Sequence, residues 1–164
     1  MRHFRIVGVA LGALLAASAA QAAGTVAVSF VEPAAFRDVR DARQRTDDNL
    51  AALRRHIEAA AASHVADGQT LRVEVTDVDL AGEIRFGALS APVRVLRGGA
   101  DWPRIELRYV LEAPGQAPRT GRAVLQDLSY LQRGTGLRPG VDLAYERRLL
   151  DEWFGTEFAA PASN

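Results

Sequence analysis

Two aspartates separated by one residue, Asp77 and Asp79, form the pattern in this chain that comes closest to a chemical site. Paired carboxylates can act as one acid and one base, because their mutual repulsion separates their pKa values. Several carboxylate oxygens from a flexible loop can instead hold Ca²⁺, and Asp101 or Glu83 would extend such a set. The pair lacks the Asp-x-Asp-x-Asp-Gly loop of an EF-hand, so we favour a third interpretation, a solvated strand end.

The other reactive side chains do not form a recognised catalytic or metal-binding pattern. His56 and His64 lie about 12 Å apart along one predicted helix, too far to share one metal ion, and are expected at the surface beside the helix border. A thiol nucleophile is excluded because the chain has no cysteine. No Gly-x-Ser-x-Gly motif is present, and neither a helix start nor a P-loop lysine follows Gly98-Gly99. We therefore predict no catalytic, cofactor-binding or metal-binding residues.

The loop-like stretch at residues 81–103, which follows the two aspartates, contains Trp102. An exposed loop tryptophan is common at binding surfaces, although more often such a side chain closes the end of a core. We predict an acidic rim at the mouth of this loop as a contact surface. The residues of the acidic rim are Asp77, Asp79, Asp101 and Trp102.

The strand that carries the two aspartates contains a conflict of periodicity. Within residues 70–80, Val73 and Val75 share one parity, whereas Val78 has the other. A regular strand would bury the carboxylates or expose the later apolar side chains, and burying unpaired carboxylates costs several kcal/mol. The sequence therefore predicts a β-bulge or strand break at Thr76-Asp77, which leaves both carboxylates at least partly exposed.

Alternating strands and two amphipathic helices account for the remaining sequence. Thr46 has the residue type of a helix N-cap, and Gly68 that of a left-handed C′ position. Pro114-Gly115 suits the centre of a type II turn in a hairpin. The predicted elements are strands at 25–31, 70–80, 105–112 and 119–128, an optional short strand at 93–96, a helix at 46–66, and a last helix that Asp142 can cap and whose apolar stripe includes Phe158.

This order, β-α-β-(β)-β-β-α, predicts an α+β fold. An amphipathic helix covers only one face of a sheet, so we expect a two-layer sandwich of two main helices on a mostly antiparallel sheet of four to five strands. A chain of this size buries about 68% of its unfolded surface, which is enough for one core. The predicted core residues are Phe30, Leu53, Ile57, Val73, Val75, Ile105, Leu107, Tyr109, Leu149, Leu150 and Trp153.

The first 22 residues have the organisation of a secretory signal peptide. A basic start at 2–5 precedes an apolar run at 6–15 and the small-residue site Ala20-Gln21-Ala22. The run falls short of the about 20 apolar residues of a permanent membrane span, and the lack of cysteine excludes a bacterial lipid anchor. We expect cleavage after Ala22, a periplasmic location, one domain over residues 23–158 and a disordered tail over 159–164.

Charge gives little guidance to the partner of this domain. Removal of residues 1–22 takes Arg2 and Arg5 from the 20 basic residues and leaves the 20 acidic residues unchanged. The resulting net charge near −2 gives no electrostatic reason to expect nucleic acid. We therefore expect the partner to be an envelope protein or ligand that the sequence does not identify.

Several segments resemble a family of secreted bacterial proteins, domain of unknown function 3016. They are RVLR at 94–97, PRIEL at 103–107, LQDL at 125–128 and LAYERRLLDEWF at 143–154, with further similarity at 25–33 and 68–82. The resemblance covers almost the whole chain after residue 22. It implies an exported protein with a single domain, and it assigns no catalytic residue.

These observations favour a non-enzymatic, envelope-associated binding or accessory module of the periplasm. Two alternatives remain, a carboxylate-based hydrolase acting on cell-wall or glycan material and a divalent-ion binder. Loss of activity or of ion binding in an Asp77→Asn/Asp79→Asn double variant would favour the alternatives. Intact partner capture by that variant would favour the binding module.

The expected export of the chain leads to the first testable prediction. The basic start, the apolar run and the Ala-Gln-Ala site should direct the chain through the inner membrane, with cleavage after Ala22. The intact mass of protein purified from the periplasm should correspond to residues 23–164. A product that retains residues 1–22, or one confined to membranes, would contradict this prediction.

Overall fold

The computed structural model describes residues 23–40, 45–87, 91–133 and 143–159. The predicted signal peptide, the Asp142 cap and the tail from residue 160 lie outside this part of the chain. Within it, the elements are β1 (Thr25–Phe30), η1 (Pro33–Ala35), α1 (Asp47–Ala61), β2 (Thr70–Asp79), β3 (Glu83–Arg85), β4 (Val93–Val95), β5 (Arg104–Glu112), β6 (Arg119–Gln126) and α2 (Ala144–Glu157).

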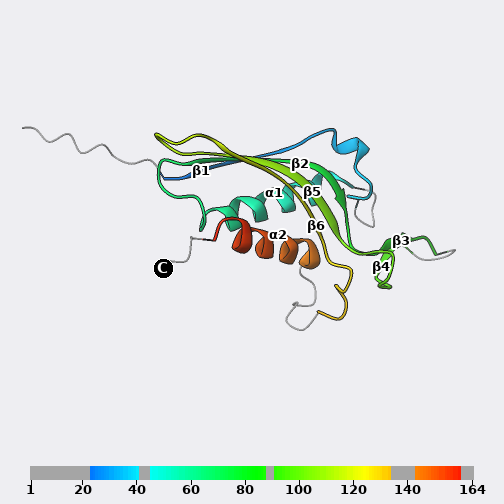
Figure 1. The fold of residues 1–164 in the computed structure, drawn as a ribbon. Coiled ribbons are helices and arrows are strands. Elements are labelled where there is room, and N and C mark those ends of the chain that lie inside the picture. Colours follow the sequence, from blue (N-terminus) through cyan, green and yellow to red (C-terminus); the bar gives the residue numbers. More distant parts are fainter. Residues whose placement is uncertain (1–22, 41–44, 88–90, 134–142, 160–164) are drawn as a thin grey trace, which may run out of the picture.

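Four strands form one sheet in the order β1-β2-β5-β6, and both helices cover the same face of it (Figure 1). β1 is parallel to β2, with α1 in the crossover between them, whereas the β2–β5 and β5–β6 pairs are antiparallel. The predicted α+β fold, with a mostly antiparallel sheet and two main helices, is therefore confirmed. The opposite face carries neither helix, and we call it the uncovered face.

The expected fifth strand does not join this sheet. β4 instead pairs antiparallel with β3 in a separate two-stranded sheet that projects from one end of the domain (Figure 1). The stretch 81–103, which the sequence suggested to be mainly loop, therefore contains a hairpin. None of the described helices combines the length and apolarity needed to cross a membrane.

The first helix is shorter than predicted. α1 ends at Ala61 rather than at residue 66, and Val65 is buried from the turn that follows. The helical spacing of apolar residues therefore extends beyond the end of the helix itself, because Val65, a buried residue of the following turn, continues it. Thr46 occupies the N-cap position but makes no capping bond with its side chain. Gly68 has the expected positive φ, 76°, in the turn before β2 rather than at the helix end.

The predicted turn between β5 and β6 is confirmed. Gly115 has a φ of 72°, which glycine adopts without steric cost, and the Gln116 N–H donates to the Ala113 carbonyl at 3.2 Å. β6 ends at Gln126, two residues before the predicted boundary. This tight connection places the two strands in a register with Arg108 opposite Arg122.

The predicted bulge in β2 is also confirmed. The pairing of β2 with β5 shifts between Val75 and Asp77, so that Asp77 faces Glu106 and Val78 faces Ile105. Val75 and Val78 are both buried, although they are three positions apart, an offset that places side chains on opposite faces of a regular strand. The extra residue at the bulge thus keeps the valines under the helices and turns the aspartates to the uncovered face.

The core lies between the sheet and the two helices. All of its predicted members are buried except Phe30, which is half-buried and packs edge-on against Phe36 with ring centroids 6.4 Å apart. Tyr109 of β5 contacts Trp153 and Phe158 at centroid distances of 5.8 and 5.2 Å. This aromatic group fixes α2 against the centre of the sheet.

Truncation of Leu107 or Leu150 tests this arrangement. Both side chains are almost completely buried, so replacement by alanine should lower the free energy of unfolding by about 2–5 kcal/mol through lost burial and cavity formation. Val124→Ala is the matched control, because Val124 is 54% exposed on the uncovered face and its truncation should have little effect. Urea melts give the comparison, and losses below about 1 kcal/mol at both leucines would contradict the packing.

Candidate functional site

Asp77, the first member of the predicted acidic rim, is held by positive groups. Its carboxylate accepts the Arg37 backbone N–H at 3.0 Å and lies 3.3 Å from Arg37 Nε and 3.4 Å from Arg104 Nη1. Its side chain is only 15% exposed. These contacts tie the segment before α1 to the end of β2, so Asp77 acts as a structural ion-pair partner in this arrangement.

Asp79 lies in a different electrostatic environment. A parallel bridge pairs it with Asp38, whose carboxylate in turn lies 3.0 Å from Arg94 Nη2. Burial, followed by the nearby Asp38 carboxylate, raises the pKa of Asp79, while Arg37 and Arg104 act in the opposite direction. The two aspartates of the original pair are thus partly exposed, as expected, but have unlike surroundings.

Asp101 belongs to another network, and Trp102 follows it in the chain. The Asp101 carboxylate accepts the Tyr130 hydroxyl at 2.9 Å and the Arg97 backbone N–H at 2.8 Å. Tyr130 is fully buried, and this burial raises its pKa to about 12. Trp102 is half-buried. Among the described contacts, none joins this network to the carboxylates of Asp77 or Asp79, so the predicted rim divides into two parts.

The histidines connect helices rather than line the surface as predicted. His56 Nε2 of α1 lies 2.8 Å from Asp151 Oδ1 of α2, and the His64 ring stacks on Phe154 at 5.9 Å. With these contacts, both histidines are half-buried. In the described parts of the chain, no group of three histidine, aspartate or glutamate side chains could hold a metal ion.

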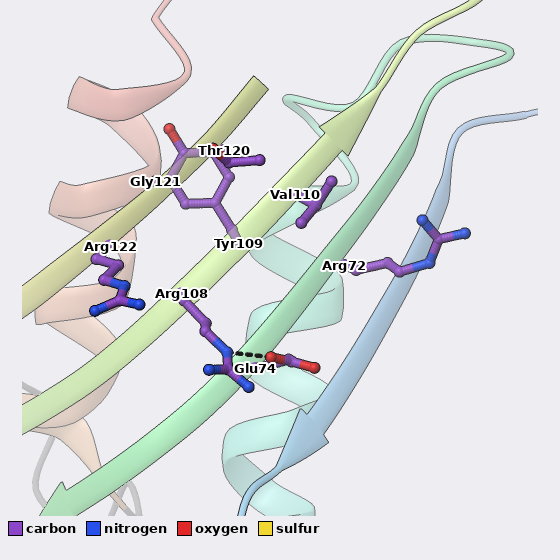
Figure 2. A pocket seen from close by; sticks show the side chains of 8 residues that line it. All are labelled: Arg72, Glu74, Arg108, Tyr109, Val110, Thr120, Gly121 and Arg122. Carbon is purple, nitrogen blue, oxygen red and sulfur yellow. Dashed lines mark hydrogen bonds and ion pairs between the residues drawn. The ribbon is translucent and has the colours of Figure 1, made fainter. Parts of the chain in front are cut away.

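The uncovered face contains two cavities that the sequence analysis did not anticipate. One, of about 360 Å³, lies over β2, β5 and β6 (Figure 2). The other, of about 200 Å³, lies towards the bulge. They share Arg108 and Arg122, so we describe them together as the sheet groove. Its lining residues are Arg72, Glu74, Thr76, Glu106, Leu107, Arg108, Tyr109, Val110, Thr120, Gly121, Arg122, Ala123 and Val124.

Ion pairs across the strands neutralise most of the charge in the sheet groove. Arg108 pairs with Glu74 of the neighbouring strand, as Figure 2 shows, and Arg72 lies 2.6 Å from Glu112. Arg122 has no charged or hydrogen-bonding partner among the described residues, and it lies directly opposite Arg108. Like charges placed opposite each other destabilise a sheet. The groove therefore contains one guanidinium whose charge nothing in the described chain neutralises.

The floor of the groove beside Arg122 is rigid. A Cβ on Gly121 would lie 2.5 Å from the Tyr109 ring, so glycine is required for this close approach. The Tyr109 hydroxyl donates to the Glu157 carboxylate of α2, which Arg119 Nη2 also reaches at 2.5 Å. The bond from Tyr109 lowers the pKa of Glu157, whereas burial raises that of Tyr109. This network braces β5 and β6 against the helix.

The sequence held a signal for the Arg108–Arg122 pair. A hairpin that turns at Pro114-Gly115 brings residues whose numbers add to about 230 opposite each other. In that register Arg108 faces Arg122, and each arginine lies on the polar side of its strand. Two like charges at facing positions of a predicted hairpin are therefore a usable indicator of an electrostatic site.

The two aspartates of β2 should respond in opposite ways to asparagine. An acid whose pKa is raised in the folded state stabilises the fold fully below its unfolded pKa, here near 3.8, and loses this contribution as the pH rises through the folded value. Asp79→Asn should therefore raise the free energy of unfolding at pH 7, with a gain that disappears near pH 3. Urea melts at the two pH values measure the difference.

Asp77→Asn is the control for this experiment. It removes a charged acceptor from a backbone N–H and two guanidinium groups, and should lower the free energy of unfolding at pH 7 by about 1–3 kcal/mol. A loss of stability at pH 7 in both variants would show that the Asp79 carboxylate is stabilised by its surroundings and would contradict the assignment.

Comparison with known proteins agrees with the resemblance seen in the sequence. The profile of the family described as Protein of unknown function (DUF3016) matches residues 24–156. No curated protein matches the chain. Among solved structures, the chain is similar to a minor lipoprotein from Acinetobacter baumannii, with 12% sequence identity and a TM-score of 0.28, over 82% of this chain and 88% of that chain. On the family match, which spans most of its length, the chain belongs to the DUF3016 family of proteins of unknown function.

Proposed function

We propose that this protein is a non-enzymatic, envelope-associated binding module that engages its partner through the uncovered face of the sheet. The observation that carries the proposal is the sheet groove with its unpaired Arg122. Both α1 and α2 lie on the other face of the sheet, so neither of them covers the groove (Figure 1).

The chemistry of the groove favours binding over catalysis. Its positive groups are guanidiniums, which stay protonated at all relevant pH values and therefore cannot serve as general acids or bases. A guanidinium presents several fixed donors and pairs well with carboxylates and other oxyanions. Val110 and Thr120 beside it add an apolar contact and a hydroxyl. These groups recognise a ligand without proton transfer, and the two carboxylates of the lining, Glu74 and Glu106, are paired with Arg108 and Arg104.

A rigid frame supports the same conclusion. β5 is held by ladder bonds to β2 on one side and to β6 on the other, β6 is held by β5, and the Tyr109–Glu157 bond fixes the floor from below. A preformed surface loses little conformational entropy when it binds. The groove therefore has the preorganisation expected of a recognition surface.

The envelope location is part of the proposal and rests on the leader. The basic start, the apolar run and the Ala20-Gln21-Ala22 site support export and cleavage after Ala22. The family match begins at residue 24, immediately beyond that site, which agrees with a leader that is separate from the domain. We accordingly place the binding module in the periplasm.

The acidic rim remains a second proposed contact surface of the same module. Asp77 and Asp79 lie at the bulged end of the uncovered face, near the smaller cavity lined by Thr76. Partner capture by an Asp77/Asp79/Asp101 triple Asn variant separates this surface from the groove. Capture at the wild-type level would remove the rim and leave the groove unaffected.

Site-specific crosslinking in living cells tests the proposed function. A photoreactive amino acid at Thr120, in the groove, should form discrete adducts that mass spectrometry can identify. The same amino acid at Ala59, exposed on α1 away from the groove, should not form them. Arg122→Glu should abolish the Thr120 adducts because it reverses the unpaired charge. Equal adducts from both positions, or adducts from Ala59 alone, would contradict the proposal.

A further inference from the structure

The two edge strands of the main sheet, β1 and β6, differ in the hydrogen bonds that their outward-facing backbone groups make. At the β1 edge, the Arg54 side chain of α1 donates to the Val28 carbonyl and lies 5.4 Å from the Phe30 ring centroid. At the β6 edge, no described group outside β5 hydrogen-bonds to the backbone of residues 119–126. Alternate residues of an edge strand direct their N–H and C=O groups away from the sheet, so β6 presents unpaired backbone donors and acceptors.

The side chains along this edge have a definite pattern. On the uncovered face, β6 presents Thr120, Arg122 and Val124 in succession, and all three are exposed. Arg122 lacks a charged partner in the described chain, and Val124 is 54% exposed. A strand added to this edge would place its own side chains about 5 Å from these residues, which is the spacing of cross-strand pairs.

We propose that the free edge of β6 accepts an extended segment of a partner protein as an additional strand, with an acidic side chain facing Arg122 and an apolar side chain, two residues away, facing Val124. The inference rests on the proposed function, because it names the partner and binding mode for the same face. Main-chain hydrogen bonds would supply affinity, and the alternating side chains would supply specificity.

Charge complementarity favours a partner protein over a second copy of this chain. The sequence of β6, Arg-Thr-Gly-Arg-Ala-Val-Leu-Gln, has two arginines and no acidic residue. Two copies of β6 paired edge to edge would therefore offer no β6 carboxylate to Arg122 and would bring the two arginines of the second β6 to the same edge. An acidic segment instead relieves the existing Arg108–Arg122 repulsion.

The test uses synthetic peptides and the processed protein. The probe is an acetylated and amidated threonine-rich peptide in which one glutamate and one valine stand two residues apart (Thr-Thr-Glu-Thr-Val-Thr-Thr), so that both face the same side of an added strand; it is compared with peptides that carry glutamine or lysine in place of the glutamate. The protein should bind the glutamate peptide about fivefold more tightly than the glutamine peptide, which is the expected size of one good cross-strand ion pair, and should bind the lysine peptide most weakly. Arg122→Glu should reverse the order of the charged peptides, whereas Arg55→Glu on α1 should leave it unchanged.

Hydrogen exchange of individual backbone amides identifies the binding mode. On addition of the glutamate peptide, amides of β6 that point away from β5 should become protected, and those of β1 should not. Binding without protection at β6, equal affinity for the charged peptides, or absence of binding would overturn the inference. Dimerisation through β6, detected by sedimentation, would overturn it in favour of a second copy. Because Arg122→Glu removes a like-charge contact, the variant should remain folded, and a urea melt verifies this.

The outcomes for the two proposals can be told apart. Specific Thr120 crosslinks together with a negative peptide result would retain the uncovered face as the binding surface and reject strand addition. Absence of specific crosslinks from Thr120 would reject the proposed function, whatever the peptides show.

Discussion

β2 lies at the centre of the domain, between β1 and β5, and one of its faces is buried under both helices. Every other contact in the main sheet depends on which of its side chains point inward, because a slip by one residue exchanges the two faces. The bulge after Val75 allows Val78 to remain inside and Asp77 outside. It also bends the strand, so that Asp77 meets Arg37 and Arg104 and the segment before α1 is attached to the sheet.

Because both helices lie on one side of the main sheet, its two faces have different electrostatic environments. Beneath the helices, a cluster of apolar and aromatic side chains forms the core, with Tyr109, Trp153 and Phe158 at the centre. On the uncovered face, charged side chains pair across strands, and such exposed pairs contribute little to stability individually. An arrangement that leaves Arg122 facing Arg108 is thus not explained by stability. The proposed recognition of an acidic partner is consistent with it.

Local pattern was sufficient to predict most of the fold. The change in the alternation of apolar residues along residues 70–80 was enough to locate the bulge. The Pro114-Gly115 pair located the hairpin turn, in which Gly115 has a positive φ. The end of α1 was misjudged because Val65, buried from a turn, continues the apolar spacing of the helix. Pairing of β3 with β4 in a separate sheet depends on strands of three residues each, which are too short to show a period.

The candidate site was less accessible from the sequence, because it depends on contacts between distant segments. The link between Asp101 and Tyr130 spans 29 residues, and that between Asp77 and Arg37 spans 40. No periodicity records such pairings, so the four rim residues looked equivalent although the structure gives them different partners. Arg122 was missed for a related reason: its significance comes from the lack of a neutralising neighbour, which only the assembled sheet reveals.

The Arg54 contact at β1 has a consequence for the stoichiometry of assembly. A sheet with two open edges can bind copies or partners at both sides and extend into a filament, because a head-to-tail contact that does not close repeats without limit. Here the side chain of Arg54 occupies a backbone acceptor at the β1 edge, whereas no described group outside β5 hydrogen-bonds to the backbone of β6. The strand addition proposed above is therefore favoured at the β6 side of the domain. Addition at one side alone would give a finite one-to-one complex and not a filament.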